Sequence, residues 1–184
     1  MENAFICWNR LDVPGHDACR LQQVAGGWRL SGVALYQEKG ELAALSYDVF
    51  HDGNWLTKTA RISGWSGRRD IDLDIRRDAG GVWFCNDQQV DAVAGCLDID
   101  LGFTPATNTN AIRRMKQAVG DAQKVMIAWI DTEDWQLKPL EQQYHLRADG
   151  IYDYGAPTQD FHSTLRVDDH GLVTDYAGLW RASA

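Results

Sequence analysis

The sequence predicts a mainly β protein, a single all-β domain over residues 1–184, and three observations support this. Apolar and polar residues alternate in several segments, as they do in half-buried strands. Runs rich in β-branched and aromatic residues are separated by short turn sequences, a spacing typical of antiparallel sandwiches, rolls and barrels. The length of 184 residues is that of one ordinary domain.

The clearest alternation lies in residues 67–76. Ile71, Leu73 and Ile75 share one side of this segment, and aspartates occupy the other side. Successive side chains of a strand point to opposite faces, so a strand is the structure that separates these two sets. The same pattern recurs over residues 97–101 and 165–168. We expect the acidic side to be a solvated strand face balanced by neighbouring arginines.

Further strands are expected where β-branched and aromatic residues are concentrated. These segments are residues 28–36, 42–50, 55–65, 124–131, 137–146 and 171–176. Turn sequences such as Asp52-Gly53 and Asp149-Gly150 lie between them, and Asp-Gly suits a tight hairpin because both residues tolerate a positive φ. Short connections favour pairing between consecutive strands, so the sequence predicts a long meander.

One helix is expected, near residues 110–119. It follows a polar loop of threonines and asparagines, and Ile112, Met115 and Val119 have helical spacing. Asn110 is suited to the N-cap position and Gly120 to the end of the helix.

Charge and composition limit the classes of partner. The net charge is −8, and such a surface repels nucleic acid and anionic lipid headgroups. The start of the chain has no basic and apolar signal, and the longest apolar run, residues 125–130, is far short of the ~20 residues that span a bilayer. We therefore expect a cytoplasmic protein without integral membrane association. Its four cysteines should then be reduced.

Standard catalytic motifs are absent from the sequence. It contains no G-x-S-x-G, no phosphate-binding glycine loop and no H-E-x-x-H. We predict no catalytic residue, cofactor or metal. One enzymatic alternative stays open, a carboxylate-dependent hydrolase of a sugar or lipid ester that uses Asp131, Glu133 or Asp175.

Two groups of residues suit an amphipathic ligand. The first is the alternating set that contains Trp55, Arg61 and Trp65, which mixes aromatic rings, hydroxyls and one cation; a solvated outer face has a similar composition. The second is Arg113, next to the polar loop, whose planar guanidinium can bind a phosphate or carboxylate. Pairing of this arginine with one of the many aspartates is the alternative.

Three segments resemble the bacterial glycolipid-binding family. They are residues 95–114, 139–144 and 171–180, and residues 28–65 fit in outline, so the resemblance covers nearly the whole chain. Ala177 stands where the family pattern has proline. The resemblance implies an antiparallel spiral β-roll, or open barrel, with one short helix, similar in shape to the carriers that move lipoproteins through the periplasm. It brings no catalytic residues with it.

The expected function is the non-catalytic binding of a lipid or glycolipid in a groove of the curved sheet. A tryptophan-rich chain suits such a groove, since tryptophan offers a large apolar face and one polar N–H. The candidate ligand-binding residues, chosen for residue type and for their place in the resembling segments, are Arg61, Trp65, Arg113, Tyr144, Tyr152, Tyr154 and Tyr176. The hydrolase and a protein-interaction module are the alternatives.

Overall fold

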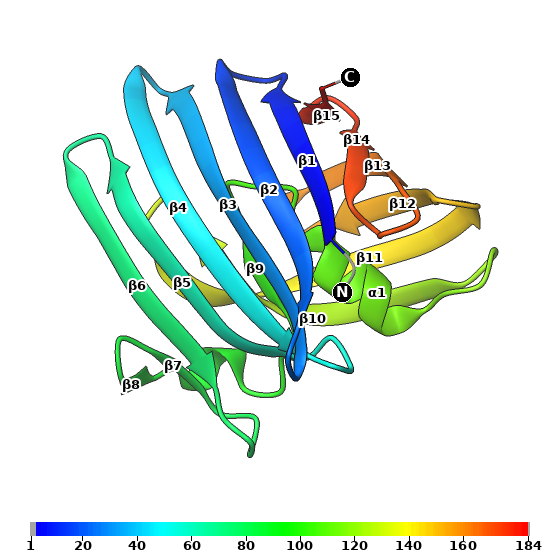
Figure 1. Ribbon diagram of the computed structural model, residues 1–184, viewed down its shortest axis with the longest axis horizontal. Coiled ribbons are helices and arrows are strands. Elements are labelled where there is room, and N and C mark those ends of the chain that lie inside the picture. Colours follow the sequence, from blue (N-terminus) through cyan, green and yellow to red (C-terminus); the bar gives the residue numbers. More distant parts are fainter. Residues whose placement is uncertain (1–2, 184) are drawn as a thin grey trace.

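The computed structural model describes residues 3–183. They form one sheet of 15 strands in the order β8-β7-β6-β5-β4-β3-β2-β1-β15-β14-β13-β12-β11-β10-β9 (Figure 1). The strands are β1 (Asn3–Arg10), β2 (Gly15–Val24), β3 (Gly27–Glu38), β4 (Glu41–Asp52), β5 (Thr57–Ser66), β6 (Arg69–Arg77), β7 (Trp83–Cys85), β8 (Gln88–Gln89), β9 (Ile99–Leu101), β10 (Ala122–Asp131), β11 (Gln136–Ala148), β12 (Ile151–Ala156), β13 (Phe161–Val167), β14 (Val173–Tyr176) and β15 (Trp180–Ala182). The helices are α1 (Asn108–Met115) and the short 3-10 turns η1 (Asp91–Val93) and η2 (Pro157–Gln159).

The sheet consists of two meanders joined at one place. Strands β1 to β8 pair in sequence order, and so do β10 to β15. Strand β1 joins them by pairing with β15, with Trp8 opposite Ala182. All neighbours are antiparallel except β9 and β10, which are parallel. The predicted all-β architecture and long meander are therefore confirmed.

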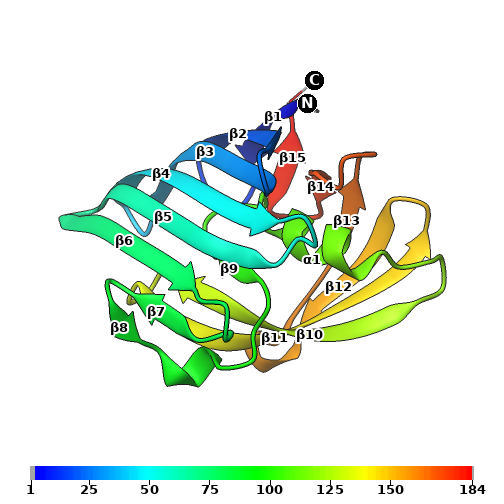
Figure 2. The ribbon, with the colours of Figure 1, turned by 60° about the horizontal axis from the view of Figure 1, so that its bottom comes forward.

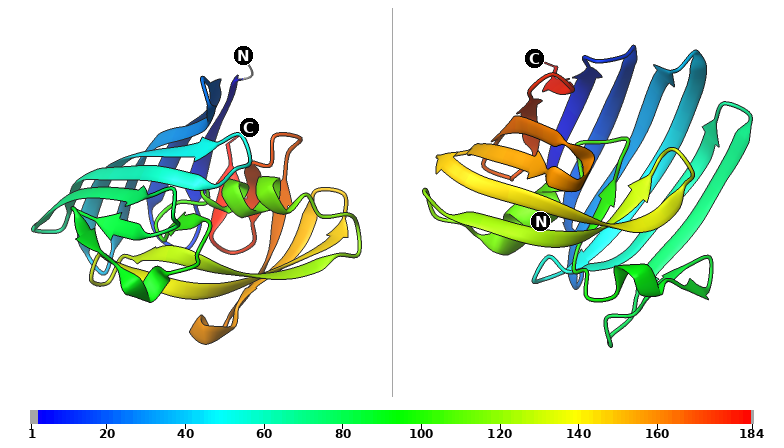
Figure 3. Two further views of the ribbon diagram at one scale, coloured as in Figure 1. Left: turned by 90° about the horizontal axis from the view of Figure 1, so that it is seen from below. Right: turned by 180° about the vertical axis from the view of Figure 1, so that it is seen from behind.

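The sheet curls so that its two halves face each other across the core (Figure 2). Alternation on β4 illustrates how the sequence builds this core, because Leu45, Tyr47 and Val49 are buried while the residues between them are more exposed. Helix α1 lies in the space between the two halves (Figure 3). Its first five residues are buried, so the helix is part of the core.

A seam of hydrogen bonds closes the roll where β9 meets the other half. The Thr57 N–H donates to the Leu97 carbonyl at 3.1 Å, and the Ile99 N–H donates to Thr57 Oγ1 at 3.1 Å. The indole N–H of Trp83 donates to the Cys96 carbonyl at 3.0 Å. These bonds connect segments that are not neighbours in the strand order.

The helix is shifted toward the N-terminus relative to its predicted position near residues 110–119. It begins at Asn108, and Lys116 adopts a left-handed conformation that ends it. Asn110 lies inside the helix, where its side-chain amide donates to the Ile99 carbonyl at 3.0 Å. This contact with β9 explains why Asn110 is not the N-cap.

The expected strands over residues 28–36, 42–50, 124–131 and 137–146 lie within β3, β4, β10 and β11. The expected common face from Trp55 to Trp65 is wrong. The pairing of β4 with β5 shifts register between Phe50 and His51, and a bulge of this kind interrupts the alternation. As a result Trp55 and Thr57 are buried, whereas Thr59 and Trp65 are exposed.

No helix within residues 3–183 combines the length and the apolar character needed to cross a bilayer. The acidic face of β6 is exposed as expected, and Arg61 on β5 forms ion pairs with Asp72 and Asp74. All four cysteines are free.

Candidate functional site

The best candidate site is a cavity of about 280 Å³, which we call the aromatic cavity. Strands β9 to β15 contribute to its walls, together with the start of α1 and the loop before it. Its lining residues are Asp100, Leu101, Gly102, Thr104, Asn108, Trp129, Leu140, Tyr154, Ala156, Gln159, Phe161, Tyr176, Leu179 and Trp180. A concave, mostly apolar site with a few polar groups is the usual form of a small-ligand site.

Packed aromatic rings form one wall of this cavity. The Tyr154 ring lies 5.0 Å from that of Tyr144 and 5.7 Å from that of Tyr176, measured between centroids. Phe161 lies 6.2 Å from Tyr154 and 6.1 Å from Tyr176. All of these pairs meet edge to face, a favourable arrangement for aromatic rings, so the wall has a fixed shape.

A polar network borders the aromatic wall and is centred on Asp100. The Asp100 carboxylate accepts hydrogen bonds from Thr107 Oγ1 at 2.8 Å and from Gln142 Nε2 at 2.7 Å. The Tyr144 hydroxyl donates to Gln142 Oε1 at 2.9 Å and accepts from Asn108 Nδ2 at 3.1 Å. Because each member is fixed by another, the carboxylate is held in one orientation.

Burial sets the charge state of the cavity. It raises the pKa of Asp100 above its usual range, and the hydrogen bonds from Thr107 and Gln142 partly offset this effect. Burial also raises the pKa values of Tyr154 and Tyr176 well above 10, so both phenols stay neutral. Asp100 is therefore the one carboxyl group among the described residues that line the cavity, and its burial favours the neutral form.

A second polar chain leads away from Thr104. Its hydroxyl donates to the Tyr47 hydroxyl at 3.3 Å, and that hydroxyl lies 3.0 and 3.2 Å from the carboxylate oxygens of Asp17. Burial raises the pKa of Asp17 to about 7, against the lowering effect of the hydrogen bonds from Thr104 and Tyr47. Asp100 therefore lines the aromatic cavity directly, and Asp17 is linked to it by hydrogen bonds through Tyr47 and the lining residue Thr104.

The seven candidate residues from the sequence fall in different places. Tyr154 and Tyr176 line the aromatic cavity. Tyr144 is buried, and its ring packs against that of Tyr154. The ring of Tyr144 also packs against that of Tyr152, with 6.3 Å between the ring centroids. The structure therefore brings the four tyrosines together. Nothing in the sequence spacing indicated this cluster, and of its members the predicted strands contained only Tyr144 and Tyr176.

Arg113 lies outside the aromatic cavity, at a separate pocket of about 430 Å³ that Tyr152 also lines. Its guanidinium carbon is 5.2 Å from the Trp55 ring and 5.6 Å from the Trp28 ring. It also donates to the Asp169 carbonyl at 3.4 Å. Cation–π contacts of this kind explain its position without a ligand.

Arg61 and Trp65 are both on the outer face of β5. Arg61 is ion-paired with Asp72 at 3.2 Å, and Trp65 is 41% exposed. They lie among other exposed side chains of the sheet and do not line the aromatic cavity.

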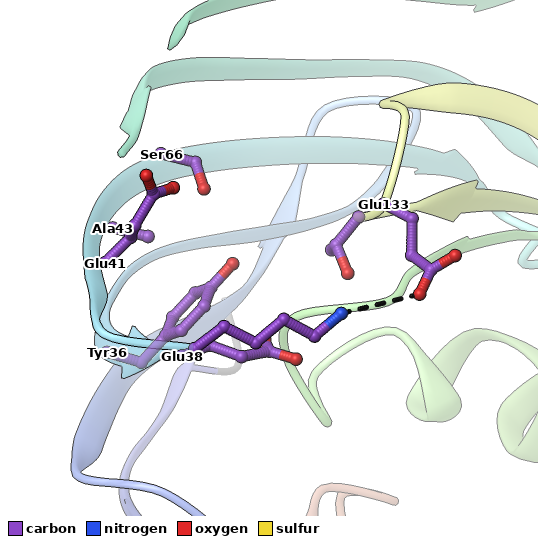
Figure 4. A pocket seen from close by; sticks show the side chains of 8 residues that line it. Tyr36, Glu38, Glu41, Ala43, Ser66 and Glu133 are labelled. Atoms are coloured by element: carbon purple, nitrogen blue, oxygen red, sulfur yellow. Dashed lines mark ion pairs between the residues drawn. The ribbon is translucent and has the colours of Figure 1, made fainter. Parts of the chain in front are cut away.

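A further pocket of about 200 Å³ lies where the β3–β4 hairpin meets the β10–β11 turn. Figure 4 shows Glu133 across this pocket from Glu38 and Glu41, with the ion pair between Lys39 and Glu133 marked. The two charged atoms of that pair are 3.6 Å apart, and both side chains are more than three-quarters exposed. Among the described residues that line this pocket, Tyr36 and Ala43 are the apolar ones, and the others are charged or hydroxyl-bearing.

The carboxylates of the hydrolase alternative are dispersed. Asp131 binds Lys138 at 2.7 Å and accepts from the Glu133 N–H at 2.9 Å, which shapes the β10–β11 turn. Asp175 pairs with Arg181 at 3.0 Å. None of these carboxylates lines the aromatic cavity. Within residues 3–183 no cluster of three or more His, Cys, Asp or Glu side chains is arranged to hold a metal ion.

Sequence reasoning missed Asp100, Asn108 and Gln142 as site residues. In the alternating pattern of residues 97–101, Asp100 is one of the polar residues, which are expected to face solvent. In the structure both sides of β9 are covered, because Ile99 and Leu101 are buried on one side and Asp100 meets Thr107 and Gln142 on the other. The position of Asp100 and Asn108 within the longest family-like segment was the available signal.

Comparison with known proteins gives a consistent result. A family model described as “Putative glycolipid-binding” matches residues 5–182. The chain is similar to a DUF1089-family protein from Pseudomonas aeruginosa of known crystal structure, with 27% identity, a TM-score of 0.78, and coverage of 88% of this chain and 89% of that chain. A β-barrel-like DUF1849 protein from Brucella abortus shares the fold, with 8% identity, a TM-score of 0.52, and coverage of 98% and 94%. No curated protein matches the sequence.

Proposed function

The chain belongs to the glycolipid-binding family, and from this premise we propose that its aromatic cavity binds an amphipathic lipid or glycolipid without catalysing a reaction on it. The observation that carries the proposal is the presence, in one concave site, of an aromatic wall and a fixed polar network. An amphipathic ligand needs both kinds of surface.

The two kinds of surface are arranged for the two parts of such a ligand. Trp129, Phe161 and Trp180 line the cavity and offer apolar contact to a hydrocarbon segment or to the C–H face of a sugar. Asp100 and Asn108 line it as well, and they offer a hydrogen-bond acceptor and an amide to hydroxyl groups.

The size of the cavity limits how much of a ligand it holds. Its volume of about 280 Å³ is near the lower end of the range for small-ligand sites, roughly 300–1,000 Å³. A single sugar ring or a short hydrocarbon segment suits this volume. The proposal is therefore that one part of the lipid is held inside and the rest extends along the protein surface.

Native mass spectrometry of the protein after incubation with a total bacterial lipid extract tests the proposal. We expect a bound mass that organic extraction releases as a lipid or glycolipid. Ala156 lines the cavity and is buried, so Ala156→Phe should fill the cavity and abolish the bound mass.

The matched control is Ala122→Phe, because Ala122 is exposed at the start of β10 and lies outside the aromatic cavity. It should keep the bound mass of the unmodified protein. A protein that stays free of ligand in the lipid extract, or a bound mass that Ala156→Phe leaves intact, contradicts the proposal.

A further inference from the structure

We propose that the aromatic cavity selects an uncharged, hydroxyl-bearing head group, such as that of a neutral glycolipid, and excludes phosphate, sulfate and carboxylate head groups. This inference rests on the proposed function, since it names the class of ligand for the same cavity. It follows from the charge of the cavity wall, from the state of the nearby cations and from the free hydrogen-bonding capacity of Asp100.

Within residues 3–183, the wall of the cavity contains one carboxyl group and no positively charged side chain. Among the described residues that line it, Asp100 is the one acidic side chain, and there is no lysine, arginine or histidine. Burying an anionic head group here is costly, because no cation of the wall compensates for the water that the anion loses. Where Asp100 is ionised, repulsion between the two negative charges adds to this cost. Anion sites in proteins instead use arginine, lysine or clustered N–H groups.

Three cations on the elements around the cavity are already paired with carboxylates. Arg114 Nη2 lies 2.6 Å from the buried Asp98 carboxylate. Lys138, opposite the cavity residue Trp129 in the pairing of β10 with β11, lies 2.7 Å from Asp131. Arg10, whose guanidinium carbon is 5.4 Å from the Trp180 ring, lies 2.9 Å from Asp12. An anionic head would have to compete with these carboxylates for a counter-charge.

The Asp100 carboxylate has acceptor capacity left for a ligand. It accepts two hydrogen bonds from protein side chains, from Thr107 and Gln142, whereas an ionised carboxylate has about four acceptor positions. Both donors are themselves fixed, because Thr107 Oγ1 accepts from the Leu101 N–H at 3.1 Å and Gln142 Oε1 accepts from Tyr144. The remaining lone pairs of the carboxyl oxygens suit the O–H donors of a sugar, and these hydrogen bonds are charge-assisted and strong where Asp100 is ionised.

The tyrosines add hydrogen-bonding groups without adding charge. The hydroxyls of Tyr154 and Tyr176 belong to lining residues whose burial keeps them protonated. The two hydroxyls are hydrogen-bonded to each other, so the pair keeps one O–H donor and further acceptor positions for a ligand, which matches the mixed donor and acceptor character of sugar hydroxyls. The indole rings of Trp129 and Trp180 line the same space and suit the apolar face of a sugar ring.

Three probes with the same chain and different heads test this selection: n-octyl β-D-glucoside, n-octyl sulfate and n-octylammonium. Binding to the unmodified protein is measured by isothermal titration calorimetry below each critical micelle concentration, at fixed ionic strength. We expect the glucoside to bind at least about tenfold more tightly than the sulfate, the difference that one charge-assisted hydrogen bond can supply.

The outcomes separate this inference from the proposed function. Sulfate binding as tight as glucoside binding, or octylammonium binding tighter than the glucoside, overturns the selection while the binding function stands. Absence of binding by all three probes, together with an empty protein in the lipid extract, overturns both.

A substitution then assigns the selection to Asp100. Asp100→Asn replaces one acceptor oxygen by an amide N–H donor with little change of shape, so the glucoside should bind about tenfold more weakly while the sulfate binds no more weakly than before. The control is Asp153→Asn, since Asp153 is a half-buried aspartate on β12 that lies outside the cavity and pairs with His145 and Arg147. This substitution should change neither affinity. Equal losses for glucoside and sulfate in Asp100→Asn, in a variant whose circular dichroism is unchanged, would overturn the assignment.

Discussion

At the scale of single residues, the unusual feature of this protein is a buried carboxylate without a cation. Asp17 is 1% exposed, and its hydrogen-bond partners are hydroxyl groups, those of Tyr47 and Thr104. Burying a carboxylate without a positive partner favours its neutral form. The folded protein therefore holds a proton on Asp17 that the unfolded chain releases at lower pH.

This proton makes stability depend on pH. The pKa of Asp17 is raised from 3.8 to about 7 in the folded state, so the stabilising contribution of its proton is complete below pH 3.8 and is lost as the pH rises toward 7. Asp17→Asn resembles the protonated form at every pH. We expect this variant to be more stable than the unmodified protein by about 2–4 kcal/mol at pH 7.5, and to differ little at pH 3.5.

Urea unfolding at a series of pH values measures this difference. Asp48→Asn is the matched control, because Asp48 lies on the same sheet with a side chain that is 42% exposed, and it should show no comparable change. A gain for Asp17→Asn that does not vary between pH 3.5 and 7.5 would show that Asp17 is not the titrating group.

The sequence contains part of the information on Asp17. In the alternation of β2, Asp17 shares its face with Cys19 and Leu21, which are buried. That pattern places a carboxylate on an apolar face. The hydroxyls that bind it could not be predicted, since Tyr47 is on β4 and Thr104 follows β9, and period-two patterns do not say which strands face each other.

At the scale of elements, one glycine allows an aromatic side chain of a neighbouring strand to lie over its backbone. Gly32 on β3 is paired with Tyr47 on β4 and with Cys19 on β2. The phenol of Tyr47 occupies the space above Gly32 on its way to Asp17. A side chain at position 32 would fill this space, so the hydrogen bond between Tyr47 and Asp17 depends on the absence of a Cβ atom.

Gly32→Ala should therefore destabilise the protein. Its Cβ would lie 2.3 Å from the Tyr47 hydroxyl oxygen and 2.6 Å from the Ala18 carbonyl oxygen, which is backbone and cannot move easily. Overpacking of this kind costs about 1–3 kcal/mol. Thermal and urea unfolding measure the loss.

Gly53→Ala is the control for the effect of replacing a glycine by alanine where no atom is displaced. A Cβ at Gly53 would meet no atom within 4 Å, so its stability should change by less than about 1 kcal/mol. If Gly32→Ala were as stable as Gly53→Ala, Tyr47 could adopt another position at little cost, and the dependence described above would be wrong.

Elements determined by the residue pattern of their own segment were predictable from the sequence. Features determined by contacts with distant segments were not. The strand of residues 69–77 follows from alternation within the segment, and the strand of residues 41–52 follows from its β-branched and aromatic residues. The helix was placed too far toward the C-terminus, because the contact of Asn110 with Ile99 and the left-handed conformation of Lys116 depend on the fold around them. The bulge beside His51, which divides the face of β5, is likewise a property of the paired strands.

At the scale of the whole molecule, a few hydrogen bonds at the seam connect the two halves of the roll. Thr57 is central to this seam, since it is fully buried and contributes both its N–H and its side-chain oxygen. The Ile99 N–H that bonds to Thr57 Oγ1 belongs to β9, whose next residue is Asp100 of the aromatic cavity. The seam therefore helps to position the candidate site.

Thr57→Val removes the oxygen that accepts from the Ile99 N–H and leaves this buried N–H without its partner. We expect a loss of about 1–3 kcal/mol of stability, together with faster hydrogen exchange at the Ile99 amide. Thr59→Val is the control, because Thr59 is exposed on the same strand, and it should change neither quantity. Equal stability and equal Ile99 exchange in the two variants would contradict this role of the seam.

The candidate site could be predicted from the sequence only in part. The four tyrosines were selected by residue type and by family resemblance, and they cluster. Asp100 and Trp180 were not selected, although both line the cavity. They are 80 residues apart in the chain, and it is the curling of the sheet, which no local pattern encodes, that brings them to one space.

The pairing of β1 with β15 also shapes how the chain reaches this structure. Within each meander the paired strands are close in sequence, whereas Trp8 and Ala182 come from opposite ends of the chain. The entropic cost of closing a loop grows with the length of the loop, and contacts between residues far apart in sequence slow folding. We expect the two meanders to form early and to join late. Until they join, each exposes an apolar face that is hidden in the finished roll, so the interval before joining is when the chain is most prone to aggregate.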